Sequence, residues 1–338
     1  MAEVNFDNLV FGKNFSDHMF VADYKDGKWG SFKIQPYENL VLSPATSSLH
    51  YGQAIFEGLK AYKNEAGEIL IFRPTENLKR LNKSAERMCM AELPEDIFMA
   101  GLTELISLDK DWIANKPGYS LYIRPLMFAT DEFIGVRPSE TYKFIIFTGP
   151  AAHYYAEPVK VKVETYYSRS MEGGTGFAKT AGNYAGSLLP AKLALQQGYH
   201  QLLWTDAKEH KYFEESGTMN VMFVIGDTIL TPPAADTILK GITRDSVLIL
   251  ARDWGMKVEE RRVSVEEVMN AAKAGTLKEA FGVGTAATIA HISVIGYEGK
   301  DYTLPDPKGR EFSNKIQKAL DDIKTGKTAD KFNWIYKV

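Results

Sequence analysis

A single lysine stands among small residues in the run Phe177-Ala-Lys179-Thr-Ala-Gly-Asn-Tyr184, shortly after a glycine-rich stretch at 173–176. A lysine amine forms a Schiff base with an aldehyde when it is partly desolvated and can lose its proton near neutral pH. Small neighbours let the planar ring of a cofactor approach such an amine. A loop lysine is usually only solvated, so Lys179 becomes a candidate catalytic residue in company with further motifs.

Two acidic residues, Glu214 and Glu215, come just before the strand-like run 221–225. A carboxylate placed against a pyridine nitrogen keeps that nitrogen protonated, which makes the ring a better electron sink. By itself such a pair is more often an exposed acidic turn. The two acids therefore indicate a pyridine-ring cofactor only when they are taken together with the lysine motif.

Two segments could bind an anion. Gly241 precedes an amphipathic run that starts at Ile242-Thr243 and ends at Gly255, and the free amides at a helix N-terminus suit a phosphate. The loop Phe281-Gly-Val-Gly-Thr-Ala-Ala287 offers further backbone amides. An ordinary helix start and a tight turn are the alternatives. The loop lacks the third glycine and the later acidic residue of a dinucleotide fingerprint.

The first half of the chain holds two more stretches that combine aromatic and polar groups. They are His50-Tyr-Gly-Gln-Ala-Ile-Phe-Glu-Gly58 and Tyr122-Ile-Arg-Pro125. Aromatic residues usually belong to the core, and an arginine in a strand is usually an edge charge. Both stretches are therefore supporting observations.

The elements that must position these residues follow from periodicity. In the first part, strand-like runs at 120–124 and 142–147 and a helix-like stretch at 76–90 predict an α+β domain. The pattern stops near 149–152, and a second irregular patch rich in glycine and serine follows at 168–176. The domain junction is expected between these two patches.

The second part also mixes strands and helices. Alternation at 159–164 predicts a strand with one buried face, and 184–197 predicts a helix that stops at Gly198. Gly226-Asp227 lies between two apolar runs as in a hairpin turn, and Ser264-Val-Glu-Glu267 is a capping box for a helix that ends near Gly275. We expect domains at 1–150 and 173–338, with 151–172 as the interdomain segment and the start of the second domain.

Composition excludes several functions. The chain has 338 residues, 45% of them hydrophobic and 25% charged, and a net charge of -3 without a basic stripe, so nucleic acid is not an expected partner. The apolar runs are too short to span a membrane, and the N-terminus lacks a basic and apolar leader. The single cysteine, Cys89, favours a reducing, cytoplasmic location. The six histidines lack metal-binding spacing, so no metal site is expected.

Taken together and in this order, the six chemical stretches closely resemble the branched-chain aminotransferase family, a group of the fold type IV pyridoxal-phosphate enzymes. The resemblance runs from about Val10 to Ile295, and the runs 49–62 and 178–187 are its most specific parts. It implies a two-domain α+β fold with a smaller N-terminal α/β domain and a larger C-terminal pseudo-barrel domain that binds pyridoxal 5'-phosphate (PLP).

The resemblance also implies the roles of the cofactor residues. Lys179 would hold PLP and move a proton between Cα and C4′, Glu215 would pair with the pyridine nitrogen, and Tyr184 would hydrogen-bond the ring hydroxyl oxygen. Arg80 would bind the phosphate together with amides of the second domain. The complete expected set is Arg80, Lys179, Tyr184, Glu215, Gly217, Thr218, Asn220, Leu239, Gly241, Ile242, Thr243 and Thr285.

For the substrate, the resemblance implies exchange of the amino group between L-leucine, L-isoleucine or L-valine and 2-oxoglutarate, with glutamate and 2-oxo acids as the other participants. Arg124 would serve the second carboxylate, and Thr285, Ala286 and Tyr122 the first. Aromatic residues, Tyr184 among them, would wall an apolar pocket. The expected substrate residues are Phe11, Tyr51, Phe56, Tyr122, Arg124, Val136, Thr285 and Ala286. A homodimer is also implied, in which residues 134–136 of one subunit close the pocket of the other.

Three alternatives remain at this point. A D-amino acid aminotransferase would share Lys179 and Glu215 but bind the carboxylate differently. The lyase that makes aminobenzoate from aminodeoxychorismate would be expected to bind a polar ring, which the aromatic pocket residues argue against. A binding module with the same fold and no turnover would lack a bound, coloured cofactor.

Overall fold

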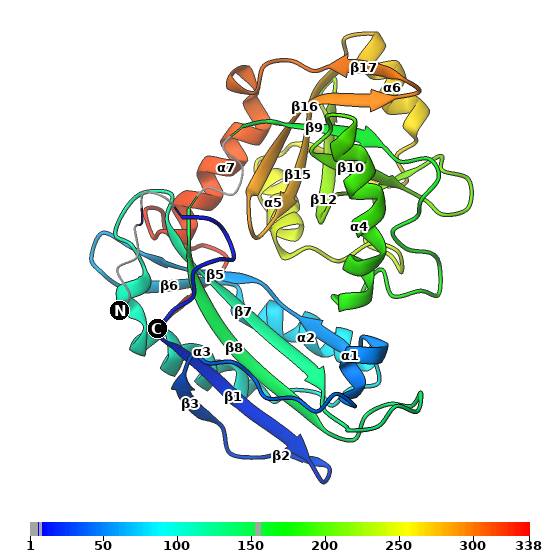
Figure 1. Ribbon diagram of the computed structural model, residues 1–338. Coiled ribbons are helices and arrows are strands. Elements are labelled where there is room, and N and C mark those ends of the chain that lie inside the picture. Colours follow the sequence, from blue (N-terminus) through cyan, green and yellow to red (C-terminus); the bar gives the residue numbers. More distant parts are fainter. Residues whose placement is uncertain (1–5, 7–8, 153–156) are drawn as a thin grey trace. The chain divides into compact units, whose positions relative to one another are not determined.

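A computed structural model describes residue 6, residues 9–152 and residues 157–338 of the chain (Figure 1). It divides into two compact units, which confirms the expected two-domain α+β architecture. The first unit comprises Met1–Tyr154, Ala178–Gly182 and Asp322–Val338, and the second comprises Tyr155–Phe177 and Asn183–Asp321. The chain therefore returns twice to the first unit.

These returns differ from the expected boundaries. Lys179 falls within the expected second domain at 173–338, whereas the structure places it in the first unit with Ala178–Gly182. The C-terminal residues 322–338 return as well, because strand β18 (Ile335–Lys337) pairs with strand β6 (Ile69–Phe72) of the first unit. With both returning segments, the first unit is at least as large as the second.

The first unit is built on one antiparallel sheet. Its strand order is β18-β6-β5-β7-β8-β1-β2, with β3 paired to β1 and β4 paired to β7. The strands are β1 His18–Lys25, β2 Lys28–Trp29, β3 Lys33–Pro36, β4 Ala54–Phe56, β5 Leu59–Lys63, β6 Ile69–Phe72, β7 Ser120–Ala129, β8 Tyr142–Ala151 and β18 Ile335–Lys337. The helices are α1 Ser47–Tyr51, α2 Pro74–Arg87, α3 Glu95–Leu108 and the short 3₁₀ helix Lys110–Trp112.

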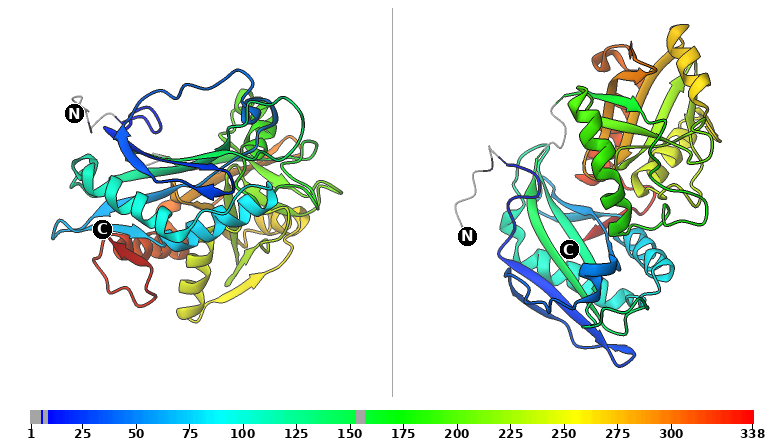
Figure 2. Two further views of the ribbon diagram at one scale, coloured as in Figure 1. Left: turned by 90° about the horizontal axis from the view of Figure 1, so that it is seen from below. Right: turned by 45° about the vertical axis from the view of Figure 1, so that its right-hand side comes forward.

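Side-chain alternation divides this sheet into two faces. Phe20 and Ala22 of β1 join the main core with buried residues of α2 and α3, while Met19 and Val21 join a second cluster on the other face. Figures 1 and 2 show α2 and α3 lying along the same face of the sheet. Met127 and Phe128 of β7, like Phe144 and Ile145 of β8, belong to opposite clusters, so both faces of these long central strands are buried at these positions.

The second unit contains a closed barrel, as the resemblance implied. The pairing path β11-β10-β9-β16-β15-β12 returns to β11, while β13, β14 and β17 extend it. The strands are β9 Val159–Val163, β10 Gln201–Thr205, β11 Phe213–Ser216, β12 Met219–Ile225, β13 Thr228–Thr231, β14 Lys257–Glu260, β15 Leu277–Gly284, β16 Thr288–Tyr297 and β17 Lys300–Thr303. The helices are α4 Ala181–Gln196, α5 Ile242–Asp253, α6 Val265–Lys273, the 3₁₀ helix Pro307–Gly309, and α7 Glu311–Lys324.

Local signals in the sequence are confirmed where they depend on near neighbours. Gly226 has φ +62° in the turn between β12 and β13, and Ser264 Oγ accepts a hydrogen bond from the amide of Glu267 at 3.0 Å at the start of α6. The helix expected at 184–197 begins three residues earlier, at Ala181. Within the part of the chain that the structure describes, no helix is long and apolar enough to cross a membrane.

Candidate active site

The segment that carries Lys179 is fixed by its backbone to two elements of the first unit. The amide of Lys179 donates to Ser84 Oγ of α2 at 2.9 Å, and its carbonyl accepts from the amide of Phe56 at 3.1 Å. Thr180 Oγ1 donates to the carbonyl of Ala54 at 2.8 Å. Lys179 therefore has a defined position beside the end of β4.

Two cations lie against the same aromatic ring. Lys179 Nζ is 4.9 Å from the ring centroid of Phe56, and Arg124 Cζ is 4.6 Å from it. An aromatic face attracts cations through its quadrupole, by about 0.5–2 kcal/mol according to desolvation. Phe56 therefore holds the candidate catalytic amine and the candidate substrate arginine near one another.

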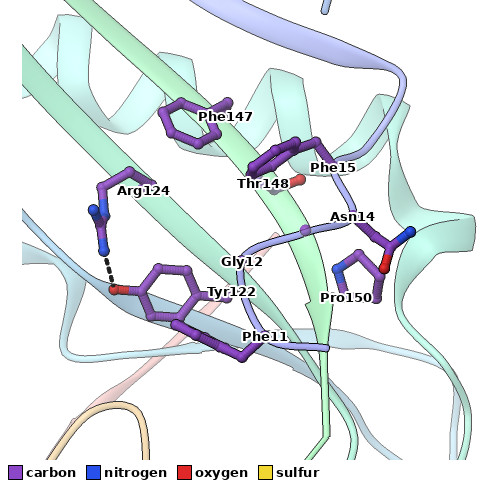
Figure 3. Close-up of a pocket in the computed structure, with 10 residues that line it drawn as sticks. Phe11, Gly12, Asn14, Phe15, Tyr122, Arg124, Phe147, Thr148 and Pro150 are labelled. Atoms are coloured by element: carbon purple, nitrogen blue, oxygen red, sulfur yellow. Dashed lines mark hydrogen bonds between the residues drawn. The ribbon is translucent and has the colours of Figure 1, made fainter. Parts of the chain in front are cut away.

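Arg124 and Tyr122 line a pocket of the first unit (Figure 3). Arg124 Nη2 donates to the hydroxyl of Tyr122 at 2.9 Å, and the Tyr122 ring meets Phe11 edge-on at 4.9 Å. The pocket volume is about 190 Å³. Within residues 9–152 and 157–338, Arg124 Nε is buried and has no hydrogen-bond partner. A buried cationic donor of this kind suits an anionic group of a ligand.

Tyr122 requires a glycine opposite its hydroxyl. A Cβ added at Gly58 would lie 2.2 Å from Tyr122 Oη. No side chain fits at that distance, so any other residue at 58 would displace the hydroxyl or the strand. Three consecutive residues, Phe56, Glu57 and Gly58, thus provide an aromatic ring, a buried carboxylate and the space that the Tyr122 hydroxyl occupies.

Arg80 is held by a buried acid. Arg80 Nε and Nη2 donate to the two carboxylate oxygens of Glu57 at 2.7 and 2.8 Å, and the Glu57 side chain is fully buried. Burial by itself raises the pKa of Glu57, but the charge and hydrogen bonds of Arg80, with Lys179 and Asn77, hold this pKa below its ordinary value. Arg80 is therefore part of a largely buried ion pair, which the sequence did not predict.

In the second unit, Glu215 lies in the β11–β12 hairpin and is 2% exposed. Asn220 Nδ2 donates to Glu215 Oε1 at 3.1 Å and to the carbonyl of Leu239 at 2.9 Å. These contacts join three of the expected cofactor residues. The alternative of an exposed acidic turn is wrong, because both Glu214 and Glu215 are buried.

An arginine that sequence reasoning missed completes this cluster. Arg169 Nε lies 2.6 Å from Glu215 Oε2, and the Arg169 side chain is 9% exposed. Arg169 Nη1 also donates to the carbonyl of Thr237 at 3.0 Å. A buried cation next to a carboxylate favours the ionised form of that carboxylate. The only sequence signal was the position of Arg169 inside the irregular patch at 168–176.

Glu214 differs from its neighbour. Burial raises the pKa of Glu214, although a hydrogen bond to Thr237 and the charge of Arg169 oppose this shift. Successive residues of a strand point to opposite faces, so Glu214 and Glu215 cannot serve the same ligand group. The direct ion pair with Arg169 distinguishes Glu215 from Glu214.

The second unit also carries the expected anion-binding segments. Gly241 is the N-cap of α5 without a side-chain hydrogen bond to the first turn, and Ile242 and Thr243 begin the helix. A Cβ at Gly241 would lie 2.0 Å from Asn220 Oδ1, so this position requires glycine. Thr285 and Ala286 lie in the turn between β15 and β16. Both segments present backbone amides of the kind that bind phosphate or carboxylate.

The remaining expected residues lie in less enclosed places. Tyr184 is partly buried on α4, and Thr218 is exposed in the β11–β12 turn next to Gly217, which has φ +56°. In the first unit, Tyr51 donates a hydrogen bond to the carbonyl of Ile134, and Val136 is 86% exposed. Tyr51 and the loop with Val136 therefore form one surface.

The donor set fits PLP and offers little to a metal ion. Taken by itself, the first unit contains a lysine and an arginine, Lys179 and Arg80. The second unit, taken by itself, contains the buried carboxylate of Glu215 and a helix N-terminus without a side-chain cap. These groups match an aldehyde, a phosphate and a ring nitrogen. Within the described residues, no group of three or more histidine, cysteine, aspartate or glutamate side chains could hold a metal ion.

Comparisons with known proteins identify the family of this chain. The family model described as amino-transferase class IV matches residues 54–295. The branched-chain-amino-acid transaminase 1 of Bacillus subtilis strain 168 is 46% identical over 336 residues, covering 98% of this chain and 94% of that protein.

Solved structures give the same result. The branched-chain aminotransferase of Thermoproteus uzoniensis, solved with norvaline, has a TM-score of 0.79 and 26% identity, covering 95% of this chain and 99% of its own. The branched-chain amino acid aminotransferase of Thermobaculum terrenum in its PLP form has a TM-score of 0.77 and 25% identity, covering 96% and 99%.

Proposed function

Because this chain belongs to the class IV aminotransferase family, we propose that it is a PLP-dependent branched-chain amino acid aminotransferase. It transfers the amino group reversibly between L-leucine, L-isoleucine or L-valine and 2-oxoglutarate. The observation that carries this proposal is the pair of cations on Phe56, where Lys179 Nζ and Arg124 share one ring. An apolar wall with one arginine suits a substrate pair in which one member has an apolar side chain and the other a carboxylate.

In the proposed mechanism, Lys179 Nζ would hold the cofactor until the substrate amine displaces it. The freed amine would then move a proton between Cα of the substrate and C4′ of the cofactor. When bound, PLP supplies the electron sink that stabilises the negative charge developing at Cα. The backbone hydrogen bonds of Lys179 to Ser84 and Phe56 restrict where the amine can move. A base that must act at one atom gains from such restriction.

The second unit is proposed to hold the ring. Glu215 keeps a proton on the ring nitrogen, and Arg169 keeps Glu215 ionised for that task. Tyr184 is proposed for the ring hydroxyl oxygen. Gly217, Thr218, Asn220, Leu239 and Gly241 shape the surrounding surface, and the amides of Ile242, Thr243 and Thr285 are proposed, with Arg80, for the phosphate.

The first unit is proposed to select the substrate. Tyr122 and the amides of Thr285 and Ala286 bind the carboxylate next to Cα, and Phe11 and Phe56 contact the apolar side chain. Arg124 binds the second carboxylate of 2-oxoglutarate or glutamate. Its buried Nε without a partner in the described residues, together with the hydrogen bond to Tyr122, supports this role.

We further propose a homodimer. The loop at 134–136 and Leu49 are exposed apolar surface, with Ile134 66% and Leu49 63% exposed, and a partner subunit would cover them. Because Tyr51 is hydrogen-bonded to this loop, Tyr51 and Val136 are proposed to act together on one pocket. The composition, with its single cysteine, supports a cytoplasmic location.

The test is the visible spectrum of the purified holoenzyme during separate additions of L-leucine, D-alanine and L-aspartate. L-Leucine alone should discharge the absorption band of the bound cofactor, because only that half-reaction matches the proposed pocket. Discharge by D-alanine instead would assign the chain to D-amino acid transamination. A bound cofactor that none of the branched-chain amino acids discharges would refute the proposed activity.

A further inference from the structure

Glu57 is a buried carboxylate to which the proposed mechanism gives no task. It is 0% exposed and follows β4 directly. Its amide donates to the carbonyl of Pro125 on β7 at 2.8 Å, so the backbone at this position is fixed to the central sheet. A fully buried carboxylate is costly unless its partners compensate for lost hydration, so its presence calls for a physical reason.

Four donors converge on this carboxylate. Oε1 accepts from Arg80 Nε at 2.7 Å, and Oε2 accepts from Arg80 Nη2 at 2.8 Å, from Asn77 Nδ2 at 2.8 Å and from the amide of Gly58 at 3.2 Å. No protonated or amide side chain could accept all of these hydrogen bonds. The site is therefore built for an ionised carboxylate.

The hydrogen bonds to Glu57 fix the plane and the direction of the Arg80 guanidinium. A guanidinium is planar, and Glu57 uses the edge formed by Nε and Nη2. The edge that includes Nη1 must therefore point away from Glu57. A fixed plane matters because arginine binds phosphate best through two parallel N–H groups.

Helix α2 presents the supporting residues on one face. Asn77, Arg80 and Ser84 are spaced at i, i+3 and i+7, which places them on the same side of the helix. Asn77 and Arg80 bind Glu57, while Ser84 Oγ accepts from the amide of Lys179 and donates to the carbonyl of Arg80. One face of α2 thus carries Arg80 and contacts both Glu57 and the backbone of Lys179.

We propose that Glu57 is a positioning residue that holds the Arg80 guanidinium in the orientation that binds the cofactor phosphate. The inference rests on the proposed phosphate role of Arg80. It follows that affinity for the phosphate of the cofactor depends on the length of the side chain at 57, and not only on its charge.

The test measures PLP and pyridoxal binding to the apoenzyme by quenching of tryptophan fluorescence. Pyridoxal lacks the phosphate, so the ratio of its dissociation constant to that of PLP isolates the contribution of the phosphate. Glu57→Asp keeps the charge but withdraws the carboxylate by one methylene group, so it should weaken PLP binding at least about tenfold and leave pyridoxal binding within roughly threefold. The matched control, Glu76→Asp at a partly exposed acid on the same helix, should change neither constant.

The outcomes separate this proposal from the one on which it rests. Equal weakening of PLP and pyridoxal by Glu57→Asp, or no weakening, would overturn the positioning role. Arg80→Lys should also lose PLP selectively. If Arg80→Lys shows no phosphate-selective loss, the phosphate role of Arg80 fails; if it does show this loss and Glu57→Asp does not, only the inference about Glu57 fails.

A second variant keeps the test decisive if Glu57→Asp does not fold. Asn77→Ala removes one hydrogen bond to Glu57 Oε2 and keeps both charges of the ion pair. Like Glu57→Asp, it should lower the ratio of the pyridoxal dissociation constant to the PLP dissociation constant, here by a few-fold. An unchanged ratio in a folded Asn77→Ala protein would count against the proposal.

Discussion

Replacement of Arg124 by leucine separates the two substrates that the enzyme must accept in turn. Arg124 donates to Tyr122 through Nη2 and lies over Phe56, but its buried Nε lacks a partner within the described residues. We expect a carboxylate of 2-oxoglutarate to accept from this guanidinium. The side chain of leucine makes no such hydrogen bond.

The expected loss of kcat/KM follows from the hydrogen bond that Arg124 would make to the second carboxylate. A hydrogen bond to a charged group contributes about 1.5–3 kcal/mol, so losing it should lower kcat/KM for 2-oxoglutarate about 10- to 150-fold. The protein itself should be affected little. Leucine loses a cation–π contact of about 0.5–1 kcal/mol and a hydrogen bond to Tyr122, but it also removes a buried donor without a partner.

The assay is single-turnover kinetics of each half-reaction, followed by stopped-flow absorbance. L-Leucine and its 2-oxo acid should react within about threefold of the wild-type rate constants, because neither carries the second carboxylate. L-Glutamate and 2-oxoglutarate should lose most of their kcat/KM through weaker binding. Urea unfolding of the same preparation checks that stability is retained.

Two results would refute this reasoning. Equal losses for leucine and 2-oxoglutarate would mean that Arg124 supports the pocket as a whole and does not recognise the second carboxylate. Unchanged kinetics with 2-oxoglutarate would place its second carboxylate elsewhere. In either case the unpaired Nε would need a different explanation.

Four further changes test the remaining roles. Lys179→Ala should lose turnover by several orders of magnitude while circular dichroism stays unchanged, because the base is removed and the backbone hydrogen bonds of the segment are kept. Glu215→Gln should slow Cα proton removal about 10²-fold or more while retaining cofactor, measured by the exchange of Cα deuterium. Gly58→Ala should raise KM for all amino acids, because its Cβ would displace the Tyr122 hydroxyl. Glu57 has a lower pKa in the folded protein than the value of 4.5 expected in the unfolded chain, so its ionised form stabilises the fold above pH 4.5. This stabilisation is lost as the pH falls through the lower folded pKa. Glu57→Gln should therefore flatten the fall of the urea-unfolding free energy below pH 4.5.

Each of these predictions has an outcome that contradicts it. Retained transamination in the lysine variant would remove Lys179 from its catalytic role, and an unchanged exchange rate in the Glu215 variant would do the same for the ring-nitrogen partner. Wild-type KM values after Gly58→Ala would mean that Tyr122 is not a substrate ligand. A stability profile in acid with the wild-type slope after Glu57→Gln would show that this carboxylate does not titrate below its ordinary value.

Sequence patterns predicted the elements whose causes are local. The N-cap at Ser264, the hairpin at Gly226-Asp227 and the helix that begins after Gly241 were all found. A cap or a turn depends on residues within a few positions, which a sequence displays directly. The family was also readable, because the lysine and glycine motifs occur in a specific order.

The partners of the site residues could not be predicted in this way. Arg80 was recognised, but the acid that holds it lies 23 positions away, and the arginine beside Glu215 comes from an irregular patch without a motif. Charged residues are common, and their pairing depends on which strands become neighbours. A carboxylate that follows β4 and an arginine on α2 meet only after the sheet and its covering helices are assembled.

The sequence by itself determined the chemistry of this protein, namely which lysine, acids and glycines are available and in what order. Only the tertiary structure decided that Lys179 belongs with the first unit, that Glu57 is buried on Arg80, and that Phe56 carries two cations. The physical reason is that burial and ion pairing arise from contacts between distant segments. The sequence specifies the chemistry of each side chain, and tertiary packing determines which charged partner that side chain contacts.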